Sequence, residues 1–122
     1  MKRLFSVLVF SLLVSMTFAQ NNLFTAIGSS DVATLSSKFG SDVEICIGTE
    51  QDFYSKSSAT KRLEKFFAEV HPKTSKFKHK GNNKNKTSEY SVGTMTSEKG
   101  NYRVFIYYEG EKITGLMFNK DE

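Results

Sequence analysis

The pattern of apolar positions divides the chain after residue 20 into a helical part and a part made of strands. Two short helices are expected first, over 23–27 and over 31–39, and each precedes a glycine that suits a helix end. A long helix is expected between a Ser55 cap and Pro72, because its apolar residues recur at spacings of three and four. The apolar stripe of this helix comprises Ala59, Leu63, Phe66, Phe67 and Val70.

Strand-like alternation marks the other segments. Residues 42–47 alternate and place Val43, Ile45 and Ile47 on one side, which is expected to face the core. A polar turn region over 48–53 with a short second strand follows, and the long helix then leads into four strands joined by hairpins. These strands are expected over 76–80, 89–97, 102–108 and 112–118. Because helices and strands are segregated, the expected class is α+β, with a curved antiparallel sheet over the helices.

The first nineteen residues have the order of a secretory signal peptide. A basic start precedes an eleven-residue apolar run, and small residues at Thr17 and Ala19 predict cleavage before Gln20. The run is too short for a membrane span, which needs roughly 20 apolar residues. We therefore expect an exported protein, periplasmic or secreted, with residues 20–122 as a single domain that has no membrane span.

Composition narrows the class of protein further. Without the first nineteen residues, the chain has 15 Lys and Arg residues and 13 Asp and Glu residues, which gives a net charge of +2. This charge is low for a nucleic-acid-binding domain, so no specific nucleic-acid partner is expected. Cys46 is the only cysteine, so it has no internal disulfide partner. His71 and His79 are the only histidines, and no zinc-ligand spacing or phosphate-binding loop is present, so neither a metal nor a cofactor is expected.

The order of elements resembles the nuclear transport factor 2-like cone, which is also called the cystatin-like fold. Residues 22–119 look like a family of small exported bacterial proteins known as domain of unknown function 4783. The resemblance implies the fold but no catalytic residues, because the family has none established. The segments that carry it are Tyr54-Ser55-Lys56, Phe66-Phe67, Lys78-His79-Lys80-Gly81, Tyr90-Ser91-Val92-Gly93-Thr94-Met95 and Asn101-Tyr102-Arg103-Val104-Phe105.

The resemblance also implies a pocket between the sheet and the helices, where catalytic members of the fold place an acid, a histidine or a tyrosine. Strand parity puts His79 on the same side as Phe77, so His79 is a candidate to face this pocket. Arg103 lies between apolar neighbours and is a candidate anchor for an anionic ligand. The full candidate set for ligand binding is Tyr54, Phe66, Phe67, His79, Tyr102 and Arg103, and Val43 and Ile45 are expected to line the same pocket.

A run of lysines is the sharpest surface feature. Lys76, Lys78 and Lys80 share one face of the strand expected over 76–80. Such a face can bind an anionic polymer of the cell envelope or a lipid headgroup. Its alternative role is structural, since lysines on an edge strand discourage pairing with other sheets.

These observations favour non-catalytic binding of a small apolar or amphipathic ligand or of a protein partner. An isomerase-like or hydratase-like enzyme is one alternative, with His79 as base and Tyr54 or Arg103 assisting, and it needs a second polar group within reach of His79. A polyanion-binding envelope module that uses the lysine strand is the other. No catalytic residue is assigned.

The late strands also predict a homodimer. The strand over 102–108 is apolar on both sides, with Phe105 and Tyr107 on the side opposite the core, and Ile113 and Met117 are expected on the same outer side of the next strand. A sheet face of this kind is normally covered, so we expect two copies to pair through it.

Overall fold

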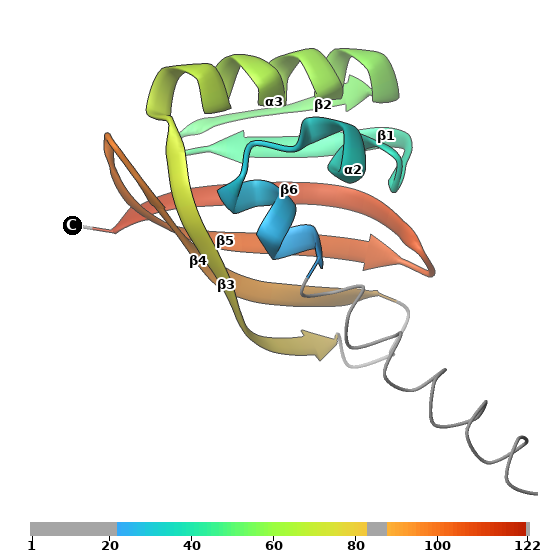
Figure 1. Cartoon of the computed structure of the whole chain (residues 1–122). Coiled ribbons are helices and arrows are strands. Elements are labelled where there is room, and N and C mark those ends of the chain that lie inside the picture. The colour runs from blue at the N-terminus through green and yellow to red at the C-terminus, as the bar shows by residue number, and fades with distance from the viewer. Residues whose placement is uncertain (1–21, 83–87, 122) are drawn as a thin grey trace, which may run out of the picture.

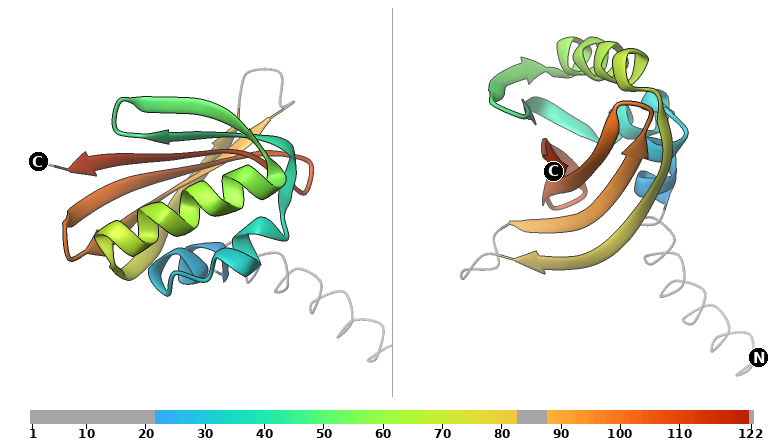
Figure 2. Two further views of the ribbon diagram at one scale, coloured as in Figure 1. Left: turned by 90° about the horizontal axis from the view of Figure 1, so that it is seen from above. Right: turned by 90° about the vertical axis from the view of Figure 1, so that its left-hand side faces the viewer.

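The computed structural model describes residues 22–82 and 88–121, so the predicted signal peptide and its cleavage site lie outside the described residues. One curved, unclosed sheet has the strand order β2-β1-β6-β5-β4-β3, and the helices gather on one side of it (Figures 1 and 2). We call that side the helix-covered face and the other side the uncovered face. The strands are β1 Phe39–Ile47, β2 Glu50–Ser55, β3 Pro72–Asn82, β4 Glu89–Ser97, β5 Gly100–Glu109 and β6 Lys112–Asp121.

The helices are a first helix over 22–28, α2 over Val32–Ser36 and α3 over Lys56–Val70. In the described part of the chain, no helix is both long and apolar enough to cross a membrane. The expected α+β class with a curved sheet is therefore confirmed.

The sheet is mixed where an antiparallel sheet was expected. Four of its five strand pairs are antiparallel, but β1 and β6 run parallel, with Ile45 opposite Leu116 and Cys46 opposite Met117. The reason is the path of the chain: α3 carries it from the β1–β2 hairpin to the far edge strand β3, and the following hairpins bring β6 back beside β1. Helix α3 thus joins the two edges of the sheet (Figure 1).

Helix α3 begins and ends where the sequence predicts. The Ser55 hydroxyl accepts a hydrogen bond from the Ser58 N–H at 3.3 Å, which satisfies one of the free donors of the first turn. At the other end His71 adopts a left-handed conformation with φ of 54°, and Pro72 directly follows it. Every residue of the predicted apolar stripe is buried.

Helix α2 is shorter than expected. The Asp31 carboxylate caps it, because it accepts hydrogen bonds from the Thr34 N–H and hydroxyl, and these bonds lower the pKa of Asp31. The helix ends at Ser36, however, and the Lys38 carbonyl accepts a bond from the Ile113 N–H at 2.7 Å. This contact draws the chain into the sheet, so Phe39 belongs to β1, where it is buried.

Aromatic rings fill the space between α3 and the sheet. The ring centroids of Phe66 and Phe118 lie 4.9 Å apart, and Tyr102 meets Phe66 edge-on at 5.5 Å. Phe66 and Phe67 are each 3% exposed and Tyr102 is 8% exposed. The expectation that these side chains, with Val43 and Ile45, border an open pocket is therefore corrected: all five belong to the packed core.

Candidate functional site

A β-bulge in β3 decides which side chains reach the uncovered face. Phe77 pairs with Gly93 and His79 pairs with the adjacent Val92, so Lys78 is an extra residue in β3. Phe77 faces the helices, where its ring centroid lies 5.8 Å from that of Phe24. His79 lies on the uncovered face, and the prediction that it shares the side of Phe77 is wrong because the bulge interrupts the alternation.

The same bulge separates the lysines. Lys76 pairs with Thr94 on the uncovered face, whereas Lys80 pairs with the buried Ser91 on the helix-covered face. Lys78, at the bulge, lies beside His79. The expectation that these three lysines share one strand face is therefore wrong, and the side-chain pair that the bulge presents together is Lys78 and His79.

These two residues border a shallow pocket of about 560 Å³ on the uncovered face, which we call the bulge pocket. Val92 pairs with Phe105, and Thr94 pairs with Arg103, so strands β3, β4 and β5 all contribute. Val92 is only 7% exposed although no described helix covers it. The residues that line the pocket are Lys78, His79, Tyr90, Val92, Gly93, Thr94, Arg103 and Phe105.

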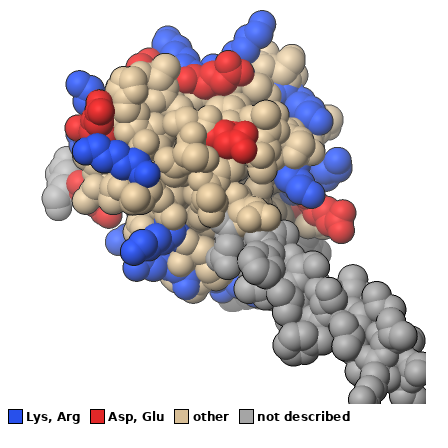
Figure 3. Space-filling view, viewed as in Figure 1, with Lys and Arg blue, Asp and Glu red and all other residues tan. Residues whose placement is uncertain are grey.

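The bulge pocket combines positive charge with an apolar surface. Lys78, His79 and Arg103 are exposed, and its lining contains no Asp or Glu. Within the described ranges none of these three side chains forms an ion pair, whereas Arg62 on α3 pairs with Glu50 at 3.0 Å. Over α3, at the top of Figure 3, acidic and basic side chains are interspersed. The bulge pocket is therefore a place where positive groups converge without acidic neighbours.

Aromatic side chains continue beyond the pocket. The rings of Phe105 and Tyr107 are stacked with their centroids 6.3 Å apart, and Tyr90 lies 6.1 Å from Tyr107. Burial raises the pKa of Tyr107, and the nearby Tyr90, Glu44 and Cys46 raise it further. The Tyr90 ring also lies over Gly81, where a Cβ would come within 2.6 Å of it, so this glycine makes room for the ring.

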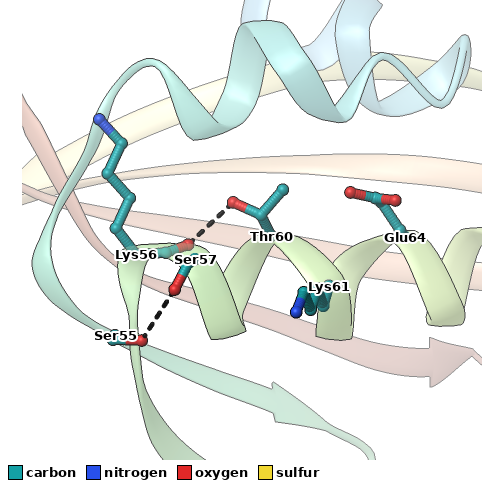
Figure 4. A pocket seen from close by; sticks show the side chains of 6 residues that line it. All are labelled: Ser55, Lys56, Ser57, Thr60, Lys61 and Glu64. Carbon is teal, nitrogen blue, oxygen red and sulfur yellow. Dashed lines mark hydrogen bonds between the residues drawn. The ribbon is translucent and has the colours of Figure 1, made fainter.

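A second hollow of about 640 Å³ runs along α3 (Figure 4). The Thr60 hydroxyl donates to the Lys56 carbonyl at 2.8 Å, and the Ser55 and Ser57 hydroxyls lie 3.4 Å apart. All of its lining residues come from one helix and its cap, and several of its polar groups bond within that helix. The lining comprises Ser55, Lys56, Ser57, Thr60, Lys61 and Glu64.

Comparison with known proteins places the chain in a family. The family model of the domain of unknown function DUF4783 matches residues 20–118. The chain belongs to the DUF4783 family. No curated protein matches the sequence.

Solved structures similar to this DUF4783 domain have its fold. A DUF4783 protein from Bacteroides uniformis superimposes with a TM-score of 0.74 at 18% identity over 82% of this chain and 94% of that chain. One from Bacteroides ovatus has a TM-score of 0.74 at 21% identity, with 82% and 93% covered. An NTF2-like protein of unknown function from Cytophaga hutchinsonii has a TM-score of 0.55 at 9% identity, with 79% and 80% covered. The recognised family and the nuclear transport factor 2-like fold are thereby confirmed.

The six candidate ligand residues of this DUF4783 domain do not lie together. Tyr54 pairs with Val43 and packs at the helix-covered face, next to the core that holds Phe66, Phe67 and Tyr102. His79 and Arg103 lie on the uncovered face in the bulge pocket. An active site that joins His79 to Tyr54 is therefore excluded by geometry, whereas one that joins His79 to Arg103 is not.

Several pocket residues were missed at the sequence level. Val92, Thr94 and Phe105 lie on ordinary strands, and no local signal in β3 revealed the bulge that brings Lys78 and His79 beside them. Among the described residues, no group of three or more His, Cys, Asp or Glu side chains is arranged to hold a metal ion.

Proposed function

We propose that this DUF4783 domain is a non-catalytic binding domain whose ligand, a small amphipathic anion, occupies the bulge pocket. The observation that carries the proposal is the bulge itself. It turns Lys78 and His79 onto the uncovered face beside Arg103, above the apolar Val92 and Phe105. Bulges that re-aim side chains in this way are common next to functional sites.

The two halves of the pocket suit the two halves of such a ligand. The planar guanidinium of Arg103 can bind a carboxylate or sulfonate through two parallel hydrogen bonds, and Lys78 adds a second positive charge. The Thr94 hydroxyl offers a further donor at the same edge. Val92 and Phe105 provide apolar contact beneath an alkyl group or a ring.

Binding is favoured over catalysis by the surroundings of His79. A catalytic base is usually held in position by a second group that bonds to it. The His79 side chain forms no hydrogen bond with any residue of 22–82 or 88–121. Its exposure on an open sheet face also leaves reacting groups in water, which weakens their electrostatic effect.

Export and self-association complete the proposal. The order of residues 1–19 supports secretion.

The uncovered face supports a homodimer in the ligand-free state, since it holds half-buried Phe105, Tyr107 and Met117 and the 70% exposed Phe53. The expectation that Ile113 lies on this face is wrong, because a register shift between Tyr107 and Tyr108 in the β5–β6 pairing places Ile113 in the core.

Titration with anilinonaphthalene sulfonate, a fluorescent aromatic anion, tests the ligand site. We expect saturable binding, which Arg103→Gln and Lys78→Gln each weaken about tenfold because a charge-assisted hydrogen bond is lost. Lys65→Gln makes the same change of charge on exposed α3 and serves as the matched control. Equal affinity in Arg103→Gln and Lys65→Gln, with both variants folded, would place the probe elsewhere and refute the proposed site.

A further inference from the structure

One row of side chains crosses the entire sheet on its uncovered face. The strand register pairs His79 with Val92, Val92 with Phe105 and Phe105 with Met117. It then pairs Met117 with Cys46 and Cys46 with Gln51. The row therefore passes without interruption through β3, β4, β5, β6, β1 and β2.

The middle of this row is apolar and its two ends are polar. Its four inner members are Val92, Phe105, Met117 and Cys46, of which Phe105 and Met117 are half-buried and the other two nearly buried. We call these four the apolar row. His79 ends it at the bulge pocket, and Gln51, which donates to the Glu44 carboxylate, ends it at β2.

The length of the apolar row can be estimated from the sheet. Neighbouring strands are about 4.8 Å apart, so the three spacings from β4 to β1 cover about 14 Å. An extended alkyl chain advances about 1.3 Å for each carbon–carbon bond, so about eleven bonds match this length. Tyr90 and Tyr107 flank the row on β4 and β5, but Gly115 and Glu44 flank it on β6 and β1, so the apolar surface narrows there to one side chain. The cations that mark its start lie at only one end.

We propose that the ligand is a free, single-chain anionic amphiphile of the fatty-acid type. Its acidic group binds Arg103, Lys78 and His79, and its alkyl chain lies along the apolar row across β5 and β6 toward β1. This inference rests on the proposed function, because it uses the bulge pocket for the acidic group. A compact aromatic anion would fill the pocket but leave Met117 and Cys46 without contact.

A free amphiphile fits better than a lipid in a bilayer. The apolar row lies flat along the sheet, so the chain must lie parallel to the protein surface, whereas bilayer chains stand perpendicular to the membrane surface. The packed core leaves Phe66 and Tyr102 in contact with each other, so an alkyl chain has no room at that point of the interior.

Calorimetry with alkyl carboxylates of 6, 8, 10 and 12 carbons, each below its micelle concentration, tests the inference on the full chain. We expect the affinity to rise about fourfold for each buried methylene and to level off near 12 carbons. Met117→Gln should weaken dodecanoate at least tenfold while leaving hexanoate and anilinonaphthalene sulfonate within twofold, because the shorter ligands end before β6. Dodecyltrimethylammonium, which has the same chain and the opposite charge, should not bind.

The outcomes separate this inference from the proposed function. If anilinonaphthalene sulfonate binding depends on Arg103 but carboxylate affinity is independent of chain length, the alkyl row is refuted and the proposed function stands. If dodecanoate and anilinonaphthalene sulfonate both bind to Arg103→Gln as well as to the parent, both are refuted. Binding to anionic phospholipid vesicles without binding of free dodecanoate would instead assign the face to a membrane surface. If the chain is a dimer, and dodecanoate neither binds to this dimer nor dissociates it, the uncovered face would be assigned to contact with a second copy.

Discussion

At the scale of single residues, Gly93 links three elements at one point. It lies in β4, pairs with Phe77 of β3, and faces the ring of Phe24 from the first helix. A Cβ built on Gly93 would overlap both the Phe24 ring and the backbone carbonyl oxygen of Lys76. The carbonyl cannot move without breaking the β3–β4 ladder directly beside the bulge.

Gly93→Ala should therefore lower the free energy of unfolding by about 3 kcal/mol, the upper range for an overpacked core. The measurement is urea denaturation followed by circular dichroism. Gly40→Ala is the matched control, because its Cβ would meet nothing closer than 3.6 Å, and it should change stability by less than about 1 kcal/mol. Equal stability of the two variants would mean that the Phe24 contact is looser than described.

At the scale of elements, the difference between α3 and β3 shows what a sequence can predict. The stripe and both ends of α3 follow from local spacing, a serine cap and a proline, so the helix is correctly predicted. The bulge in β3 follows from how β3 pairs with β4, which periodicity within one strand does not report. For this reason the core helix was predicted, whereas the side on which His79 and the lysines lie was not.

Deletion of Lys78 tests the account of the bulge. His79 would then follow Phe77 directly and still pair with Val92, so the remaining register is kept. We expect the variant to fold with a melting temperature near that of the parent and to bind anilinonaphthalene sulfonate about tenfold more weakly. Deletion of Thr94, which lies in a regular part of the β4–β5 ladder, should unfold the protein. Unfolding by the Lys78 deletion as well would show that the extra residue is required for the strand itself.

At the scale of the whole molecule, the two faces of the sheet have different roles. The helices and a continuous core occupy one face, and the interior holds packed rings where a pocket was expected. The uncovered face carries positive charge on β3 and β5, whereas Asp42 and Glu44 lie on its β1 strand. Two copies related by an axis along the central strands would place these opposite charges together.

Sedimentation of the ligand-free chain at micromolar concentration tests this arrangement. The parent domain over residues 20–122 should sediment as a dimer, and Met117→Lys should be monomeric because it introduces a charge into the apolar row. Thr60→Lys on α3 adds the same charge outside the interface and should remain dimeric. A monomeric parent would mean that the uncovered face remains open without a ligand, and would leave the bulge pocket unaffected.

In the proposed function the uncovered face, and not the interior of the cone, holds the ligand. Nuclear magnetic resonance of the ¹⁵N-labelled chain, titrated with anilinonaphthalene sulfonate, tests this claim most directly. We expect the largest amide shift changes at His79, Thr94 and Arg103, and no change at Leu63 and Phe66 on the core side of α3. The largest changes on α3 and at Tyr102 would show that the probe enters the interior, which would refute a ligand site on the uncovered face.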